Sequence, residues 1–359
     1  MMKLPRFKPR ISPTLSQSLL IRSYTLQPVK GSLPIDVASR VLFAAHGCTG
    51  SSWGVRLRTT PSAGGTYPLS IEVVVRRVEG VESGVYRYVS ERVYEHELKK
   101  LSSTVTSGTA PLTLRVMCKP ERTTNYYGSR GYMYINEEVG HLIQSVVVEC
   151  GVLGLTLNFE VSPAAEGVVA TIDVYPAKMP EYPASLFEGE RGAEEALARR
   201  RSIRNYTYRS LSKGALEYLV TCAVGPERGL ETYPPVDDYS AVLYVAVSRV
   251  DDMGPGVYLY DWRKGFVLVK AGDVSDKLSS AALGQDWIRD AAVNFIIASR
   301  RGDWRSEVEA GMIGQNIYLA ATAIRLGTVA VGAFRDQTVS NVLGIVERPL
   351  YIMPVGVLA

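Results

Sequence analysis

The chain repeats itself, and no other feature of its 359 residues constrains the fold as strongly. Residues 84–88 (GVYRY) return as 256–260 (GVYLY), an offset of 172 residues (84 to 256). Residues 138–140 (EVG) return as 309–311 (EAG), an offset of 171 (138 to 309). Motifs that recur in the same order at a nearly constant offset predict two copies of one domain within the chain.

Each copy begins with an amphipathic helix pattern that stops at a glycine. Apolar side chains follow the i, i+3, i+4, i+7 spacing of a helix with one buried face, at Ala38, Val41, Leu42 and Ala45 and again at Leu216, Leu219, Val220 and Ala223. Gly47 and Gly225 follow these helices, where a left-handed residue commonly ends a helix. An Arg-Ser pair lies upstream of each helix, at 22–23 and 201–202.

The remaining pattern predicts an α+β fold. Each first helix is followed by a strand (71–75; 241–247), a hairpin, another strand (112–117; 293–299), a long helix (137–150; 308–324) and closing strands. This order predicts a mainly antiparallel or mixed central sheet flanked by helices. Apolar residues cover nearly every face of the long helices, which predicts that they are buried on several sides, at the junction between the halves.

These elements divide the chain into four predicted parts. Residues 1–18 are basic and interrupted by prolines, and they are expected to be a loose N-terminal extension. Residues 19–178 are the first repeat, 179–192 a proline-containing linker, and 193–359 the second repeat.

Composition argues against several classes of partner. The formal charge of +4 comes from 40 basic and 36 acidic residues that are interspersed, which predicts no nucleic-acid partner. The most apolar stretch, 146–157, contains Glu149 and is shorter than the about 20 residues that span a bilayer, so no membrane association is expected. The four cysteines form no Cys-x-x-Cys pair, which predicts neither a metal site nor a disulfide. We expect a cytoplasmic protein.

Residues 58–69 (RTTPSAGGTYPL) resemble the R-x-x-P-S-A-G-x-x-Y-P signature of SagB-type dehydrogenases, a branch of the nitroreductase superfamily. Residues 130–132, followed by Glu138 and 140–141, are similar to the R-G-Y…E-x-G-H segment of the same family. Segments of the second half that are similar to other superfamily motifs lie at 200–204, 314–316, 326–327, 331–334 and 349–351. The resemblance covers nearly the whole chain.

Proteins of this family are usually two-fold dimers with flavin mononucleotide (FMN) at the subunit interface. The resemblance therefore implies two nitroreductase-like domains that form a pseudo-dimer within one chain, with one FMN site built from both repeats. The cofactor-binding residues that it implies are Arg200, Arg201, Ser202, Arg204, Val331, Gly332 and Ala333 from the second repeat, and Pro61, Ser62, Ala63, Gly64 and Gly65 from the first. It implies no metal.

These residue types suit a flavin. Arginine binds a phosphate dianion through a planar fork of donors. Small residues at 61–65 allow close approach of backbone to a flat ring, and the N–H groups at 332–333 suit the flavin N5, which accepts hydride. Taken singly, each pattern has another interpretation: 199–204 as a solvated basic helix end or a nucleic-acid patch, and the small-residue segments as plain turns.

The opposite combination of motifs is incomplete. It would join residues 22–23 to 157–160 and to 234–238, where two prolines and two carboxylates replace the Ser-Ala-Gly-Gly loop. An acidic side chain beside a phosphate costs about 1 kcal/mol even at high effective dielectric. One FMN per chain is therefore expected.

Several other side chains are expected to be structural. His141 in the long helix is predicted to be a packed, hydrogen-bonded core residue. His46 and Cys48 flank the first helix stop, and Trp53 is predicted to belong to the core.

The activity implied by the resemblance is hydride transfer through FMN. SagB-type enzymes oxidise thiazoline or oxazoline rings in peptides, and their oxidases place a Lys-Tyr pair near the segment that here holds Tyr126 and Tyr127, the candidate catalytic residues. The lysine is absent, and tyrosine needs assistance to act as a base because its unperturbed pKa is near 10. Azoline oxidation and the identity of the base stay open.

Two other functions stay open. One is an NAD(P)H-dependent reductase of nitro or quinone compounds, in which the nicotinamide is a transient donor without its own Rossmann domain, since the chain has no G-x-G-x-x-G fingerprint. The other is a non-catalytic flavin- or partner-binding subunit of a peptide-maturation complex. The expected substrate is a small molecule or a peptide, and the expected assembly is a monomeric pseudo-dimer or a homodimer of pseudo-dimers.

Overall fold

The computed structural model describes residues 1–11, 13–52, 54–105 and 107–359, so Trp53, predicted as a core residue, lies outside the described residues. The chain forms two compact units. Unit 1 comprises Met1–Ser185 and Gly192–Arg199, and unit 2 comprises Leu186–Arg191 and Arg200–Ala359.

Unit 1 is built on an antiparallel sheet. Among the described residues its seven strands lie in the order β1-β6-β5-β4-β7-β9-β8. The strands are β1 (Met2–Lys3), β4 (Leu69–Val75), β5 (Gly84–Arg92), β6 (Glu95–Ser102), β7 (Leu112–Cys118), β8 (Leu155–Val161) and β9 (Gly167–Pro176), with β2 (Cys48–Ser52) and β3 (Val55–Arg58) as a separate ribbon. The helices are α1 (Leu15–Leu20), α2 (Ile35–His46), α3 (Glu121–Tyr127), α4 (Arg130–Leu153) and α5 (Ala193–Arg199), and the 3-10 turns are η1 (Ser23–Thr25) and η2 (Ala63–Gly65).

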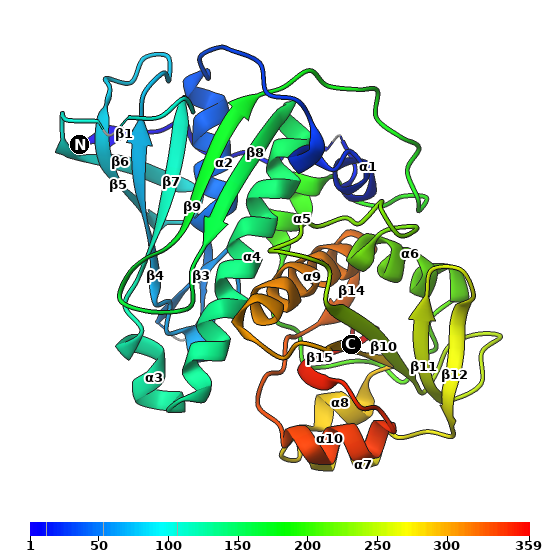
Figure 1. The fold of residues 1–359 in the computed structure, drawn as a ribbon. Helices are drawn as coiled ribbons and strands as arrows, with labels where there is room; N and C mark the ends of the chain where they lie inside the picture. Colours follow the sequence, from blue (N-terminus) through cyan, green and yellow to red (C-terminus); the bar gives the residue numbers. More distant parts are fainter. Residues whose placement is uncertain (12, 53, 106) are drawn as a thin grey trace. The chain divides into compact units, whose positions relative to one another are not determined.

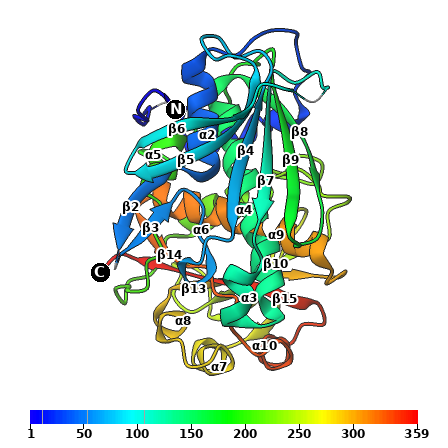
Figure 2. The ribbon, with the colours of Figure 1, turned by 90° about the vertical axis from the view of Figure 1, so that its left-hand side faces the viewer.

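Helices α2 and α4 pack against each other and lie behind the sheet of unit 1 in the view of Figure 2. Side chains alternate along β4, where Ile71 and Val73 are buried and Glu72 is half-buried. Glu72 forms an ion pair with Arg115 of β7, at 2.9 Å. This alternation is typical of an antiparallel sheet with one face on the core and one face more polar.

Unit 2 is built on a second antiparallel sheet. Within the described residues its six strands lie in the order β12-β11-β10-β13-β15-β14. The strands are β10 (Ala241–Val247), β11 (Gly256–Asp261), β12 (Gly265–Ala271), β13 (Val293–Ser299), β14 (Leu326–Thr328) and β15 (Arg348–Val357). The helices are α6 (Lys213–Val224), α7 (Ser275–Ala281), α8 (Asp286–Asp290), α9 (Trp304–Ala323) and α10 (Asp336–Leu343).

The sheet of unit 2 has helices on both faces. Helices α6 and α9 pack together, and α9 also contacts β13 and β15. On the other face, side chains of α7, α8 and α10 join those of the sheet in one hydrophobic cluster, which includes Leu278, Ile288, Ile296 and Leu343. Figure 1 shows these three short helices gathered beside β15. Every residue of β13 is buried, as expected for a strand covered on both faces.

The two units share one topology. The order β6-β5-β4-β7-β9-β8 of unit 1 corresponds strand for strand to β12-β11-β10-β13-β15-β14 of unit 2, and each long helix lies between the fourth and fifth strands of this set in chain order. The predicted α+β class with two domains is confirmed. Helices α4 and α9 are buried on nearly all sides, as their apolar pattern predicts.

The prediction that residues 1–18 form a loose extension is wrong. Met2 and Lys3 pair with β6, and the Phe7 ring stacks on Phe43 of α2 with a centroid separation of 4.1 Å. Thr14 caps α1 through a capping box with Gln17. The apolar residues between the prolines are what fix this segment, because burying them is favourable.

The compact units also differ from the predicted domain boundary at residue 193. Helix α5 belongs to unit 1, where the backbone N–H of Ala193 donates to Pro13 O at 3.1 Å. The side chain of Glu194 is buried and forms an ion pair with Arg40 at 2.6 Å. Residues 186–191 belong to unit 2 instead.

Both first helices end before the predicted glycines, but only one glycine has a positive φ. Gly225, after α6, has φ +98°, whereas Gly47, after α2, has φ −67° and is extended rather than left-handed. Gly47 is needed for a different reason: a Cβ there would overlap the buried Phe43 ring.

The four cysteines, Cys48, Cys118, Cys150 and Cys222, are buried free thiols. None of the helices in the described part of the chain has both the length and the apolar character needed to cross a membrane.

Candidate functional site

In unit 2, the predicted Arg-Ser segment and Ala330, the residue just before the predicted 331–333 turn, meet at Tyr318 of α9. The Ser202 Oγ lies 2.9 Å from the Tyr318 Oη, which also accepts the backbone N–H of Ala330 at 2.7 Å. The Arg200 guanidinium lies over the Tyr318 ring, 5.0 Å from its centre. One buried hydroxyl therefore fixes both predicted segments relative to each other.

The residues of the Arg-Ser segment differ in their exposure to solvent. Arg200 is buried, Arg201 is half-buried, and Ser202 and Arg204 are exposed. The Arg201 guanidinium donates to Arg200 O at 2.7 Å, and the Arg204 guanidinium lies 5.4 Å from the Trp287 ring centre. Ordered guanidinium groups beside an exposed hydroxyl are a donor set that suits a phosphate.

The 331–333 turn is held on both sides. Val331 is buried and exchanges two backbone hydrogen bonds with Ile352 of β15, at 2.9 and 3.0 Å. The side-chain amide of Gln285 donates to Ala333 O at 2.8 Å. Gly332 and Ala333 are half-exposed, so the turn offers small residues on a rigid support.

In unit 1, the 61–65 loop folds around the Ser62 hydroxyl. Ser62 Oγ accepts the backbone N–H of Tyr67 at 2.9 Å, and Ser62 O accepts that of Gly65 at 3.1 Å. Gly64 and Gly65 have φ of +58° and +67°, a left-handed conformation that favours glycine. A Cβ on Gly64 would lie 2.5 Å from the Tyr127 Oη, so the Tyr127 side chain would have to shift to make room for it.

The two candidate catalytic tyrosines differ in position. Tyr127 lies beside Gly64, and its ring makes an edge contact with Tyr134, with centroids 5.2 Å apart. Tyr126 is 78% exposed. The structure therefore brings Tyr127, and not Tyr126, to the 61–65 loop.

A buried polar cluster lies next to this loop. The Arg58 guanidinium donates to His46 O at 2.9 Å and Ser90 O at 3.2 Å, and burial lowers the Arg58 pKa. Glu138 of α4 is 3% exposed, and burial raises its pKa to about 8, against the opposing effects of Ser62, Arg58 and Arg122. Burial, then the nearby Arg58 and Arg122, lower the His46 pKa well below its usual value, so His46 is neutral.

The sequence flagged Glu138 only as part of a motif and did not flag Tyr318. Glu138 and Tyr318 both lie in long helices that carry apolar residues on nearly every face. Within such a helix, a polar residue is the one feature of the sequence that could have indicated a functional position. The partner of Tyr318, Ser202, is far away in sequence, and only the fold brings the two together.

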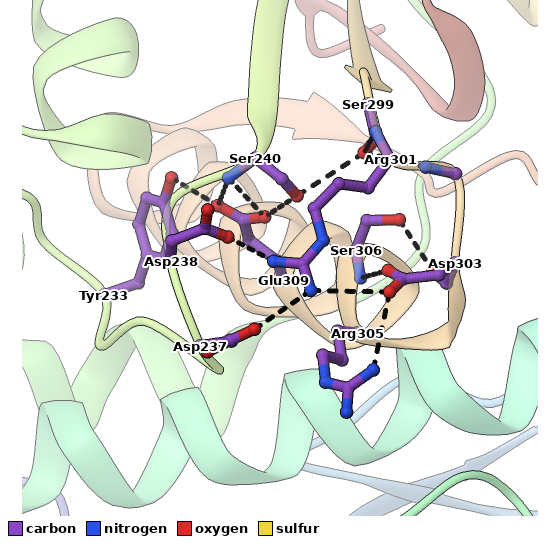
Figure 3. A network of polar contacts seen from close by, with 11 residues as sticks. Tyr233, Asp237, Asp238, Ser240, Ser299, Arg301, Asp303, Arg305, Ser306 and Glu309 are labelled. Atoms are coloured by element: carbon purple, nitrogen blue, oxygen red, sulfur yellow. Dashed lines mark hydrogen bonds and ion pairs between the residues drawn. The ribbon is translucent and has the colours of Figure 1, made fainter.

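The opposite combination of motifs has a different local structure. Ser23 is buried and donates to Val147 O at 2.7 Å, whereas its counterpart Ser202 is exposed. Figure 3 shows Arg301 surrounded by carboxylates: it pairs with Asp237 at 3.1 Å, with Asp303 at 3.5 Å, and with Asp238. The acidic residues of the 234–238 loop thus already have an ion-pair partner in the same unit, although one arginine leaves a net negative charge on the two of them.

Glu309 anchors residues on both sides of the 234–238 loop. It accepts the backbone N–H of Ser240 at 3.1 Å, the Ser240 hydroxyl at 2.6 Å and the Tyr233 hydroxyl at 3.2 Å (Figure 3). Asp303 caps α9 by accepting the Ser306 N–H at 3.1 Å. This corner of unit 2 is a closed structural network.

Comparison with known proteins decides the family. Residues 197–357 match the sequence profile of the Nitroreductase family. A Methanocaldococcus jannaschii protein described as a nitroreductase, MJ1384, is 37% identical over 177 residues, which are 45% of this chain and 89% of that protein. The chain belongs to the nitroreductase family. Oxidoreductase chemistry is accordingly the class expected of it.

Solved structures extend the likeness to the fold of the whole chain. A crystal structure of a protein described as a nitroreductase, from Anabaena variabilis, has a TM-score of 0.76 at 20% identity and covers 99% of this chain and 94% of its own. A nitroreductase-like protein from Desulfovibrio desulfuricans, solved in complex with FMN, covers 47% of this chain and 88% of its own, at 20% identity and a TM-score of 0.36.

Proposed function

We propose that this nitroreductase-family chain is an FMN-dependent oxidoreductase of the SagB type, which transfers hydride through a single flavin held by residues of both units. The observation that carries the proposal is the difference between the two equivalent loops. The 61–65 loop has left-handed glycines and a half-buried serine, whereas the 234–238 loop has carboxylates bound to Arg301.

The residues present fit FMN in their chemistry. Arg201, Ser202 and Arg204 supply the cationic and hydroxyl donors that a phosphate dianion needs, and Tyr318 fixes Ser202. Gly64 and Gly65 expose backbone where a planar ring needs close approach. Bound FMN would supply the hydride-accepting N5, and the 331–333 turn is the segment that we propose for contact with it.

The same reasoning supports one flavin per chain. The opposite combination would need Ser23, which is buried and bonded to Val147, and the 234–238 loop, whose carboxylates oppose an anion. The matching strand orders of the two units support an origin by tandem duplication, after which one site kept the flavin residues and the other lost them.

The substrate is proposed only as a class, a small molecule or a peptide that exchanges two electrons and protons. Tyr127 is the candidate side chain at the loop, because Tyr126 is mostly exposed. The residue directly before Tyr127 is Tyr126 and not lysine, so an azoline oxidase of the usual Lys-Tyr type is not the form of the activity that we propose.

Anaerobic reduction of the purified, FMN-saturated chain tests the proposal. NADH or NADPH that bleaches the flavin within seconds, followed by reoxidation with a quinone or nitroaromatic compound, would establish an NAD(P)H-dependent reductase. Flavin that binds but is bleached only by dithionite would support a dedicated peptide enzyme or a flavin-binding subunit. A chain that does not bind FMN at all would contradict the proposal.

A further inference from the structure

Strands β6 of unit 1 and β12 of unit 2 occupy the same place in the two repeats. Each is the second strand of the hairpin that begins with the repeated Gly-Val-Tyr motif, and the registers match. Tyr88 pairs with Leu98 in unit 1, and Tyr260 pairs with Phe266 in unit 2. Both hairpins also have a register shift directly after the valine of the motif. The two strands can therefore be compared residue by residue.

In unit 1 the outer side of this strand is covered by the first residues of the chain. Met2 and Lys3 of β1 pair with Leu98 and Glu97 of β6, in antiparallel register. Lys3 lies directly opposite Glu97, and opposite charges at such a position stabilise a strand pair. The segment that covers β6 thus matches it in charge as well as in backbone hydrogen bonds.

The next part of β6 is protected in a different way. Lys99 and Lys100 follow Leu98 and are exposed. Lysines on an edge strand oppose pairing with a further strand, because pairing would take their charges out of water. The edge of unit 1 is thus closed by a strand at Leu98 and by charge beyond it.

Unit 2 has neither form of protection. Strand β12 is the last of its sheet, and β11 is its one neighbouring strand among the described residues (Figure 1). Val267 and Leu268 occupy the positions of Lys99 and Lys100. Leu268 and Val269 are 52% and 41% exposed. Backbone N–H and C=O groups without a strand partner, beside exposed apolar side chains, are suited to the addition of another strand.

The charge around β12 determines which kind of strand fits. Arg263 and Lys264 in the turn before β12 are exposed, and Lys270 lies near the other end of the strand. Asp261 accepts the backbone N–H groups of Arg263 and Lys264, both at 2.9 Å, so one carboxylate accompanies two cations. Antiparallel pairing of β12 with a second copy of itself would bring these basic ends together, which is unfavourable. A strand with acidic residues would instead find opposite charges.

We propose that β12 binds, by strand addition, an extended segment of another polypeptide in which apolar and acidic residues alternate. Backbone hydrogen bonds would extend the sheet of unit 2, and apolar side chains of the segment would cover Val267 and Leu268. Its acidic side chains would lie near Arg263 and Lys264. The site belongs to unit 2 alone and needs no flavin, so the proposal goes beyond the proposed function.

The experiment titrates the fluorescein-labelled peptide Glu-Val-Glu-Val-Glu-Val-Glu with the full-length chain and follows fluorescence anisotropy. We expect binding, with slower amide hydrogen exchange at residues 263–271 and unchanged exchange at residues 95–102 of unit 1. The same peptide with lysine in place of glutamate should bind at least about tenfold more weakly. Proline in place of the central valine should also weaken binding, because proline has no N–H for the strand pair.

Two double variants locate the site. Val267→Lys with Leu268→Lys gives β12 the lysines of unit 1 and should weaken binding by about tenfold. Arg263→Glu with Lys264→Glu should reverse the preference, so that the lysine peptide binds better than the glutamate peptide. This charge reversal carries the test if the first variant does not fold. Val346→Lys is the control, since Val346 is 96% exposed but lies outside the strands, and it should bind as wild type does.

Three outcomes would overturn the proposal. One is equal binding by wild type and the Val267→Lys, Leu268→Lys variant, and another is protection from exchange that omits residues 263–271. The third is a dimer in sedimentation that the same variant converts to a monomer, because a second copy would then cover β12. FMN binding, measured on the same preparations, should be unchanged in both double variants, so the failure of this proposal and the failure of the proposed function are distinguishable.

Discussion

The two units differ in one region, which consists of the loop before the first central strand and the glutamate of the long helix. Both have a glutamate at the same place in the long central helix, next to the segment that precedes the first central strand. In unit 1 this segment is the 61–65 loop, with two left-handed glycines, and one carboxylate oxygen of Glu138 on α4 has no donor among the residues that the structure describes. In unit 2 it is the 234–238 loop, with Arg301 among three carboxylates and Glu309 fully bonded.

The comparison separates what the fold needs from what a ligand needs. The strand order and the buried central helix are common to both units, so they do not require the 61–65 loop. The carboxylates of the unit 2 corner have internal partners, whereas exposed backbone and a carboxyl oxygen without a donor among the described residues bring unit 1 no such benefit. Features that lower the stability of the fold are expected at functional sites.

The largest expected effect is the pH dependence of stability at Glu138. Because its folded pKa of about 8 lies above its ordinary value of 4.5, its contribution to stability is full below pH 4.5 and is lost as pH rises through 8. At 1.36 kcal/mol per pKa unit, the loss is at most about 5 kcal/mol. Thermal melts of Glu138→Gln and wild type should therefore diverge as pH rises, in favour of the variant. If the melting temperatures of Glu138→Gln and wild type changed equally with pH, Glu138 would not be the destabilising carboxylate that distinguishes it from Glu309.

Removal of Glu309 should destabilise the protein by about 3 kcal/mol, because the buried donors of Ser240 and Tyr233 lose their acceptor. Glu309→Ala is measured by urea unfolding at pH 7, with FMN affinity as the second readout. We expect stability to fall and affinity per folded molecule to stay unchanged. A loss of FMN affinity without a loss of stability would mean that the closed corner of unit 2 takes part in binding.

Arg201 and Arg22 hold equivalent places in the two repeats, so their replacement tests the asymmetry of binding. Arg201→Ala should weaken FMN binding by about 10 to 100-fold, since hydrogen bonds to charged groups contribute about 1.5–3 kcal/mol. Arg22→Ala should leave the affinity within about twofold, the size of effect expected away from the site. The affinity of both variants for FMN is measured by titration at one salt concentration. Equal losses of affinity in the two variants would contradict an asymmetric site.

The smallest expected effect comes from the glycine that the 61–65 loop needs. Gly64→Ala places a Cβ 2.5 Å from the Tyr127 Oη at a positive φ, and should cost about 1–2 kcal/mol of stability together with FMN affinity. Gly229→Ala is the control in unit 2, with positive φ but open space around it. If the two variants bind FMN equally well, the Gly64 position has only a conformational role.

Much of the fold could be predicted from the sequence because periodicity and repeats report local geometry. Residues 241–247 and 293–299 are strands with the predicted bounds, and α2 and α6 end just before their predicted glycines. The helices α7, α8 and α10 were not predicted, because their segments are short and amphipathic and gain order from packing on the sheet. The ordered structure of the first residues of the chain was also not predicted, because Phe7 contacts Phe43 only in the folded protein.

The candidate site was predicted in its segments but not in its connections. The Arg-Ser segment and the 331–333 turn were predicted separately, and the hydroxyl of Tyr318 that joins them was missed. Ser62 was predicted as a small loop residue, and the hydrogen bond that its Oγ accepts from the Tyr67 N–H was not. A sequence pattern identifies residue types that suit a ligand, whereas pairings between distant residues depend on tertiary packing.

The central claim is most directly tested by the ratio of FMN to polypeptide. The purified chain is saturated with FMN, freed of excess cofactor, and assayed for released flavin by absorbance and for protein by amino-acid analysis. One FMN per chain is the result that unequal units predict. Two per chain would show that the 234–238 corner binds flavin as well, and none would show that the 61–65 loop does not serve this cofactor.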